Sequence, residues 1–476
     1  MKNSLKVSYK NSLNGYIKSF LLIPLLMFTI SCEKLLEVDT PPASLLKSQV
    51  FTDDATAQAA VRGIYSYLMN DYGCTGFQTA WRTGLSADEL ILFENDPSII
   101  EFEENNLSAN NKYISQLWTY AYATIYRANN VIENLEASGD LSEAAKAQFI
   151  GEAKFLRAFL YFYLVNFYGD VPMVTSTDYL TNVKMTRTPS ETIYQQMVND
   201  LNEAIELLPA AYPTTGRYRA NKAVASALLA RVYLYQGKWA DSETIATTVL
   251  GNTNYGLVAL TDITLPGNTE AIWQIPNHPD EFYTTEGEHF ISYSDMVWKF
   301  SYFGLRDNFV GAGNLSGAFE NGDTRKSSWI ELSSKDYMIP YKYRSTYSSD
   351  GSRTENSTVL RLAEQYLIRA EARAQQNKLD LAIADVDVIR ERAGLPLIAI
   401  TNSGISKTAL LDAIMQERRV ELFTEGGHRW FDLKRTGKAV AVLSAIKTGF
   451  TANDLLYPIP AGELNKDPFL EQNPGY

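Results

Sequence analysis

One stretch of the chain decides the fold, residues 142–172, with the sequence SEAAKAQFIGEAKFLRAFLYFYLVNFYGDVP. Ser142 is a favoured residue for capping the start of a helix, and Gly169 and Pro172 are typical of the turn that ends one. Between them, the segment Phe155–Leu164 is apolar on nearly every side. A helix of this kind is stable only when neighbouring elements enclose it, so the sequence predicts a buried central helix.

Helical periodicity continues on both sides of this stretch. Apolar residues at spacings of three and four predict a helix that begins near Tyr113 and ends at Gly139-Asp140. Thr52 is placed to cap an earlier helix over residues 53–67. Further helices are predicted over residues 190–208, 222–236, 239–250, 359–376, 380–392, 407–423 and 428–435. The fold class is therefore predicted to be all-α.

Two of the predicted helix pairs share one pattern. In each, an alanine is followed seven residues later by a residue that tolerates the left-handed conformation, and then by Lys and a bulky apolar residue. The pattern occurs at Ala230 with Gly237-Lys238-Trp239, and at Ala370 with Asn377-Lys378-Leu379. It is typical of tetratricopeptide-like helix–turn–helix units. Because long inserts separate the units, we expect a divergent helical-repeat scaffold over about 113–250 and 359–435.

Two segments lack the helical period, residues 70–112 and 255–358. Both are rich in Gly, Ser, Asn and Asp, and both carry many large aromatic side chains. Loops held by a rigid scaffold commonly carry the functional residues of a protein. The two segments are therefore predicted to be long irregular inserts that together form a binding face.

Composition excludes several classes of function. The chain has 476 residues, of which 45% are hydrophobic and 21% charged, enough for a large core. With only three His and two Cys, multi-histidine metal sites, Ser-His relays and a disulfide scaffold are disfavoured. The formal net charge is −12, and removing the first 31 residues leaves 39 basic and 55 acidic residues, a net charge of −16. Such a surface repels nucleic acid and polyanionic substrates.

The amino terminus is typical of an export signal. Four lysines precede the apolar run Phe20–Ile30, which is too short to cross a bilayer and suits a secretory signal. Ser31 precedes Cys32, as in a bacterial lipoprotein signal, so we expect residues 1–31 to be removed and Cys32 to carry the lipid. An ordinary signal peptide with an incidental cysteine is the alternative. Residues 32–50 are then a lipidated tether, and no later apolar run reaches the ~18 residues of a membrane span.

Five strings, in one order along the chain, resemble those of the SusD/RagB family of glycan-binding lipoproteins. The strings are EKLLEVDTPP at 33–42, EAKFLRA at 152–158 leading to FYGDVP at 167–172, LRLAEQYLIRAEA at 360–372, ERRVELF at 417–423 leading to HRWFDL at 428–433, and YPIP at 457–460 with QNPGY at 472–476. Each string alone is a weak signal, but five in the family's order are a specific one.

The resemblance implies a single SusD-like α domain over residues 51–476, attached to the outer membrane through the N-terminal lipid and facing outward. It implies a partner, a TonB-dependent transporter of the SusC type, over which the lipoprotein acts as a lid. It also implies that the protein captures an oligosaccharide or polysaccharide for import and is not an enzyme.

Candidate ligand contacts follow from the chemistry of sugars and from the resemblance. Sugar rings stack on aromatic side chains, and their hydroxyls bond to Asn, Asp, Arg or Gln. The family's sugar contacts lie just after an Asp-Glu pair, here Asp88-Glu89, and ahead of an Asp-x-Arg segment, here Asp323-Thr324-Arg325. Transfer by position predicts carbohydrate contacts at Trp81, Arg82, Phe93, Asn95, Tyr283, Tyr293, Trp298 and Tyr302.

Other charged residues are predicted to be structural. Over residues 417–435, acidic and basic residues alternate at helical spacings, which favours ion pairs over a catalytic role. Glu101, Glu103 and Glu104 could bind a structural Ca²⁺, but the EF-hand pattern is missing. No metal site and no cofactor are therefore predicted.

Two other functions remain open from the sequence. A glycoside hydrolase needs two carboxylates ~5–10 Å apart, a separation that a sequence cannot measure. A helical-repeat scaffold for protein interaction is the second alternative, because such repeats commonly bind peptides. The sequence contains no Gly-rich phosphate loop, Gly-x-Ser-x-Gly elbow or Cys-x-x-Cys motif. Glycan binding without catalysis is the leading hypothesis.

Overall fold

The computed structural model describes residues 50–69, 73, 75–277, 282–291, 302–306, 315–333, 337–346 and 349–476. All of these except residue 50 belong to one unit, Phe51–Tyr476. Its longer helices are α4 (Asp54–Leu68), α5 (Gly76–Ser86), α6 (Pro97–Glu104), α7 (Lys112–Ala137), α8 (Glu143–Tyr168), α10 (Ser190–Leu207), α11 (Lys222–Tyr235), α12 (Trp239–Leu250), α15 (Leu362–Gln375), α16 (Leu379–Arg392), α18 (Lys407–Glu421) and α19 (His428–Arg435). The shorter ones are α9 (Tyr179–Asn182), α13 (Thr285–Phe290), α14 (Thr324–Trp329), α17 (Ile398–Thr401), α20 (Ala439–Leu443) and α21 (Ala461–Lys466).

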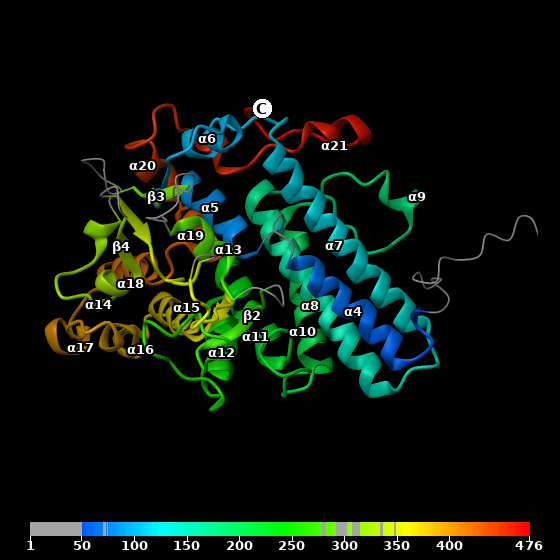
Figure 1. The fold of residues 1–476 in the computed structure, drawn as a ribbon, viewed down its shortest axis with the longest axis horizontal. Helices are drawn as coiled ribbons and strands as arrows, with labels where there is room; N and C mark the ends of the chain where they lie inside the picture. The colour runs from blue at the N-terminus through cyan, green and yellow to red at the C-terminus, as the bar shows by residue number, and fades with distance from the viewer. Residues whose placement is uncertain are drawn as a thin grey trace, which may run out of the picture. The chain divides into compact units, whose positions relative to one another are not determined.

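The predicted central helix is α8. The Ser142 side chain accepts the N–H of the third helical residue, and Gly169 at the other end has a φ of +73°. α7 and α10 pack along α8 (Figure 1), and residues 155–165 are buried throughout. The one charged side chain in that stretch, Arg157, contacts Asp200 of α10 at 2.6 Å. Over the described ranges, no helix has both the length and the apolar character that crossing a bilayer requires.

Both predicted helix–turn–helix units are present, as α11–α12 and α15–α16. Gly237 and Asn377 have φ values of +68° and +61°, and the N–H of the lysine after each donates to a carbonyl five residues back at 2.9 Å. The same closure, which the sequence pattern missed, joins α19 to α20 at Gly437, where Lys438 N–H donates to Leu433. α12 packs against α15, so the two units lie side by side (Figure 1). The predicted all-α, tetratricopeptide-like scaffold is confirmed.

Two helix starts differ from the prediction. Asp53, and not Thr52, caps α4, because the Asp53 side chain accepts the N–H of Thr56 at 2.8 Å. The helix expected from Val359 begins instead at Leu362. Residues 357–361 form strand β6, which pairs with a strand from elsewhere in the chain. Local periodicity cannot reveal a strand partner that is distant in the sequence.

In the described parts of the inserts, three two-stranded antiparallel sheets are present. β1 (Leu90–Leu92) pairs with β3 (Phe303–Leu305), β2 (Ala271–Ile275) with β6 (Ser357–Arg361), and β4 (Ile330–Leu332) with β5 (Met338–Pro340). The first of these sheets joins the two inserts, with Leu92 opposite Phe303. The first insert is also less irregular than predicted, since it contains α5, β1 and α6.

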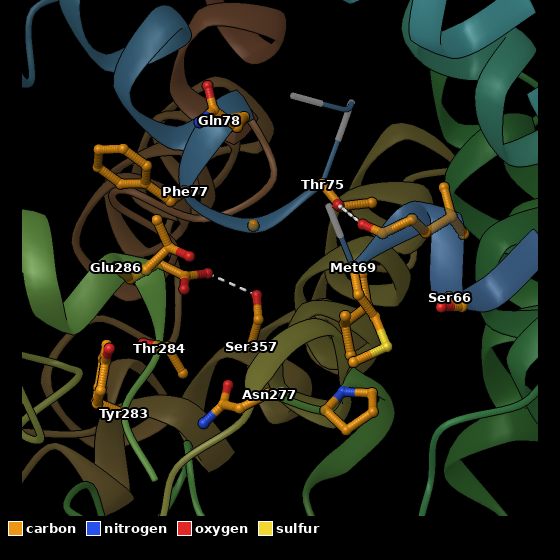
Figure 2. Close-up of a pocket in the computed structure, with 15 residues that line it drawn as sticks. Ser66, Met69, Thr75, Phe77, Gln78, Asn277, Tyr283, Thr284, Glu286 and Ser357 are labelled. Atoms are coloured by element: carbon orange, nitrogen blue, oxygen red, sulfur yellow. Dashed lines mark hydrogen bonds between the residues drawn. The ribbon is translucent and has the colours of Figure 1, made fainter. Parts of the chain in front are cut away.

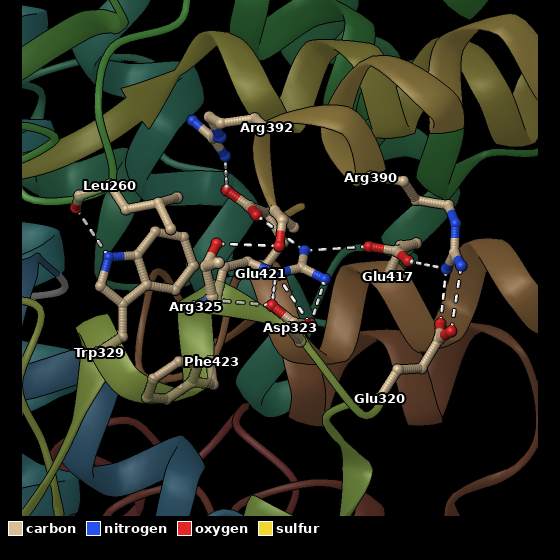
Figure 3. Close-up of polar contacts among 12 residues, drawn as sticks. Leu260, Glu320, Asp323, Arg325, Trp329, Arg390, Arg392, Glu417, Glu421 and Phe423 are labelled. Atoms are coloured by element: carbon tan, nitrogen blue, oxygen red, sulfur yellow. Dashed lines mark hydrogen bonds and ion pairs between the residues drawn. The ribbon is translucent and has the colours of Figure 1, made fainter. Parts of the chain in front are cut away.

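Buried ion pairs hold the second insert against α16 and α18 (Figure 3). Arg325 of α14 contacts Asp323 at 2.7 Å, and it contacts Glu417 and Glu421 of α18 at 3.0 Å each. Arg390 of α16 contacts the same Glu417 at 2.7 Å. The alternating charges of residues 417–435 therefore form structural ion pairs, as predicted. Further pairs in this segment join Arg418 and Arg435 to Asp432, and Arg419 and Arg429 to Asp88.

Candidate ligand-binding site

A cavity of about 300 Å³ opens where α4 ends, α5 begins and β2 ends (Figure 2). Short elements from both inserts supply most of its walls. The lining residues are Ser66, Leu68 and Met69 from α4 and its end, Thr75, Gly76, Phe77 and Gln78 from the start of α5, Ile275, Pro276 and Asn277 from the end of β2, Tyr283, Thr284, Thr285 and Glu286 around the start of α13, and Ser357 of β6.

Close backbone approach fixes one wall of the cavity. Gly76 has a φ of +51°, and a Cβ there would lie 2.7 Å from the Ser357 hydroxyl and 2.8 Å from Glu286 Oε1. Only glycine fits this position without displacing one of these two groups. The Ser357 hydroxyl donates to Glu286 Oε1 at 2.5 Å, and Figure 2 shows this bond at the cavity wall. Glu286 itself is 4% exposed.

The lining suits a neutral polar ligand. Among the described lining residues, Glu286 is the only charged side chain, and most of the others present hydroxyl, amide or apolar groups. Behind Ser357, burial and the Glu286 carboxylate raise the pKa of Tyr343 well above its usual value, so that hydroxyl stays neutral. The Tyr343 hydroxyl oxygen accepts the N–H of Thr358 at 3.0 Å. Such a cavity offers hydrogen bonds to hydroxyls and an apolar surface, but no counter-charge for an anion.

A row of rings leads from the cavity across β1 and β3. We call Phe77, His289, Tyr302, Phe93 and Tyr337 the aromatic row. Ring centroids are 4.3 Å apart for Phe77 and His289, 5.4 Å for His289 and Tyr302, and 4.4 Å for Phe93 and Tyr337. The N–H of Phe93 donates to the carbonyl of Tyr302 at 2.9 Å, which continues the β1–β3 register and puts both side chains on one face. Tyr302 and Tyr337 are each 37% exposed.

Glycine at position 304 makes room for the aromatic row. A Cβ on Gly304 would lie 2.3 Å from Cζ of Phe93, so the Phe93 ring covers the backbone of β3. Phe303, on the other face of that strand, is buried. β3 is therefore covered on one side by a half-buried ring, Phe93, and carries a core ring, Phe303, on the other.

The structure corrects two predicted contacts, Trp81 and Arg82, which lie in the core. Trp81 is 2% exposed, and its ring packs against Phe102 at 5.1 Å and stacks with Phe303 at 5.9 Å. Arg82 is fully buried, and its guanidinium donates to the carbonyl of Gln78 at 3.1 Å. Covered rings cannot stack on a sugar. We therefore assign Trp81 to the core beneath β3, where it supports Phe303. Arg82 instead holds the chain at the start of α5, because its guanidinium also donates to the carbonyl of Gly73 at 3.2 Å.

The other predicted contacts are distributed as follows. Tyr283 lines the cavity, and Phe93 and Tyr302 belong to the aromatic row. Asn95 is exposed in the loop between β1 and α6, and it does not line the cavity. Three further predicted residues lie outside the described residues, namely Cys32, Tyr293 and Trp298.

Three members of the aromatic row were not predicted as contacts. Phe77 is only 6% exposed and joins the row to the core, whereas Tyr337 is 37% exposed. Nothing local in the sequence separates Tyr337 from aromatic neighbours that turn inward. His289 is one of only three histidines, and no local pattern marks it as a ligand contact. The deciding contacts are tertiary: α5, which carries Phe77, packs against α13, which carries His289. The Tyr337 ring packs against Phe93 of the first insert at 4.4 Å.

Acidic residues near the site bond to the chain itself. The Glu101 carboxylate accepts the N–H of Ser108 at 2.9 Å, and the Glu103 carboxylate accepts the N–H of Leu92 at 3.1 Å. In the part of the chain that the structure describes, no group of three or more His, Cys, Asp or Glu is arranged to hold a metal ion. These two glutamates therefore stabilise the loops around β1 and α6.

Comparison with protein families gives two matches. A family model described as "SusD family" matches residues 293–476, and one described as "Starch-binding associating with outer membrane" matches residues 53–234. Together the two matches cover most of the unit that contains the cavity and the aromatic row.

Individual relatives match over nearly the whole chain. SusD-like protein P25 of Formosa agariphila is 26% identical, over 95% of this chain and 98% of that protein. A solved laminarin-binding SusD-like protein is 25% identical with a TM-score of 0.75, over 90% of this chain and all of that one. Surface glycan-binding protein A of Bacteroides thetaiotaomicron, solved with laminarihexaose, has a TM-score of 0.73 at 20% identity over 89% of this chain and all of that one, a likeness of fold.

Proposed function

The chain belongs to the SusD/RagB family, and from that membership we propose that it is a lipoprotein of the outer membrane that binds a neutral glycan at the cell surface. In this proposal, residues 1–31 are the signal, Cys32 carries the lipid and residues 32–50 are the tether. The protein holds its ligand without cleaving it and hands it to a TonB-dependent transporter of the SusC type.

The aromatic row beside the cavity is the observation that supports this proposal most. The exposed rings of Tyr302 and Tyr337 offer flat faces to the C–H surfaces of sugar rings, at about 1 kcal/mol each beyond buried area. The cavity next to them supplies hydroxyl and amide groups for the hydroxyls of the same chain. A glycan that lies along the row with one end in the cavity uses both.

The charge of the site favours a neutral ligand. Glu286 is the only charged residue among the described cavity residues, and the chain without its first 31 residues has a net charge of −16. Both features repel sulfated or carboxylated chains at this site. Laminarin, a neutral glucan bound by one of the related proteins, is therefore the first ligand to test.

The lining also favours binding over hydrolysis. A glycosidase uses two carboxyl groups about 5–10 Å apart across the scissile bond. Among the described residues that line the cavity, Glu286 is the only carboxylate, and it is already bonded to Ser357. We therefore expect no new reducing ends when the purified protein is incubated with a glycan that it binds.

Replacing Tyr302 and Tyr337 together with alanine is expected to weaken laminarin binding by ten- to a hundredfold, since two stacking contacts of about 0.5–1.5 kcal/mol and their buried area are lost. Affinity electrophoresis in laminarin gels and isothermal titration measure the effect. Tyr179→Ala is the matched control, because Tyr179 is 71% exposed on α9, apart from the cavity and the row. If the double variant binds like the control, the site assignment is wrong. If the unaltered protein retains no neutral glycan from a panel, the proposed function is wrong.

A further inference from the structure

A second cavity lies near the opposite end of β2 from the first. Its volume is about 390 Å³, and its walls are the connection between α10 and α11 and the segment after α12. Within the described ranges, the two cavities share no lining residue. The first adjoins the β2 end at Ile275, whereas the second adjoins the end at Ala271, whose carbonyl accepts a hydrogen bond from Arg217.

Hydrogen bonds and stacking hold the walls of this cavity in place. The Arg217 guanidinium lies over the Tyr255 ring, 4.6 Å from its centroid, and donates to the carbonyls of Ala271 at 2.5 Å and Asn254 at 3.1 Å. The Tyr212 hydroxyl lies 2.6 Å from the Tyr255 hydroxyl and donates to the carbonyl of β2 residue 272 at 2.7 Å. A ligand therefore meets a surface that is already ordered, which lowers the entropic cost of binding.

The charge of this cavity is opposite in sign to that of the whole protein. None of the described residues that line it is acidic, and Arg217 is the only charged one among them. Among the described residues, no carboxylate forms an ion pair with Arg217. Two of its five N–H groups are used on carbonyls, which leaves three donors and a full positive charge. An anionic group in this cavity gains a charge-assisted hydrogen bond.

Uncommitted polar groups surround that charge. The side-chain amide of Asn254, Nδ2 of Asn252 and the hydroxyl of Thr214 line the cavity, and none has a hydrogen-bond partner among the described residues. Nδ2 of Asn252 donates, whereas the Asn254 amide and the Thr214 hydroxyl can both donate and accept, so together they suit ring hydroxyls. An inorganic anion would fill only a small part of 390 Å³ and would leave these groups unused.

We propose that this second cavity binds one acidic sugar unit, a ring that carries a carboxylate or a sulfate, with Arg217 on the anion and the Asn and Thr groups on the hydroxyls. The site is separate from the neutral-glycan site, and the proposal does not depend on the function assigned to that site. It adds a second binding chemistry at the other end of β2.

Titration of glucuronic acid, glucose 6-sulfate, glucose and inorganic sulfate into the intact protein in detergent tests the proposal. We expect at least one of the two acidic sugars to bind more tightly than both glucose and sulfate. Asn254→Asp, which puts a negative charge on the lining, is expected to weaken that binding about fivefold, the order of one exposed charge pair. Thr253→Asp is the matched control, since Thr253 is exposed and does not line the cavity.

A variant that fills the cavity distinguishes binding in this cavity from binding elsewhere on the surface. Thr214→Trp is expected to abolish binding of the acidic sugar, whereas Thr215→Trp, on the next residue outside the lining, is expected to leave it unchanged. The Tyr302→Ala/Tyr337→Ala variant is expected to bind the acidic sugar normally. The proposal is overturned if glucose or sulfate binds as tightly as both acidic sugars, if the two Asp variants have equal effects, or if Thr214→Trp still binds.

Discussion

Replacing Glu421 with alanine is expected to lower the free energy of unfolding by about 3–5 kcal/mol, the cost of removing one partner from a buried ion-pair network. Glu421 lies at the end of α18 and is fully buried. Arg325 reaches its carboxylate at 3.0 Å and Arg361 at 2.5 Å, and Arg392 also contacts it. Figure 3 shows the Arg325 and Arg392 contacts. These arginines come from α14, β6 and α16, so one carboxylate joins three separate parts of the chain.

The electrostatics around Glu421 explain the size of this effect. Burial alone raises the pKa of a carboxyl group, but Arg392, Arg361 and Arg325 outweigh it and hold the pKa of Glu421 well below its usual range. The ionised form is thus the form that the fold stabilises. Alanine leaves three buried guanidinium groups with fewer acceptors, and it leaves a void in place of the side chain.

Guanidinium-induced unfolding followed by circular dichroism at pH 7 measures the loss in Glu421→Ala. Asp412→Ala is the matched control on the same helix, because Asp412 pairs with Lys438 while 61% exposed and is expected to cost less than about 1 kcal/mol. Glu421→Gln, which keeps the side-chain volume and one acceptor, is measured as well in case the alanine variant does not fold. A loss in both Glu421 variants no larger than that in Asp412→Ala contradicts the network's role.

The sequence predicted the scaffold well because the interactions that form its helices and turns are between residues close together in the chain. The cap at Ser142, the left-handed turns at Gly237 and Asn377 and the apolar spacing along α8 act within a few residues of one another. Where the deciding contact was distant, the prediction failed. Val359 has good helical neighbours in the sequence, but residues 357–361 pair with β2.

At the candidate site, too, local features were predicted and features set by distant contacts were not. Aromatic residues in the inserts predicted a binding face, and Tyr283, Phe93 and Tyr302 do lie at the cavity or in the aromatic row. Nothing local, however, separates Phe93 from Trp81. Which rings face outward depends on the pairing of β1 with β3, two strands from different inserts, and on the space above Gly304.

A second buried glutamate, Glu89, has the opposite electrostatic environment to Glu421. Glu89 is 3% exposed, and its Oε2 accepts only a long hydrogen bond, 3.3 Å, from the N–H of Thr424. Its Oε1 has no hydrogen-bond partner among the described residues. The nearby Arg429 forms its ion pair with Asp88 at 2.7 Å instead. Burial and the Asp88 charge together raise the pKa of Glu89 to about 7.

This raised pKa makes the protein less stable as the pH increases. Between the usual pKa of 4.5 and the folded value of about 7, the folded protein holds a proton on Glu89 that the unfolded chain has lost. Stability contributed by the neutral carboxyl is therefore present below pH 4.5 and lost as the pH rises through 7. The full loss is about 3 kcal/mol, from the difference between the two pKa values.

Glu89→Gln removes the cost of ionising a buried carboxyl. At pH 8 the free energy of unfolding of the variant is therefore expected to be up to about 3 kcal/mol higher than that of the unaltered protein. At pH 4.5 the two proteins are expected to be nearly equal, because a neutral glutamic acid and a glutamine bury similar groups. Chemical unfolding at both pH values measures the difference. Glu94→Gln, the same change at an exposed residue between β1 and α6, controls for the altered net charge. If Glu89→Gln raises the free energy of unfolding equally at the two pH values, or lowers it at pH 8, then the fold does not hold Glu89 as a neutral acid, in contrast to the ionised Glu421.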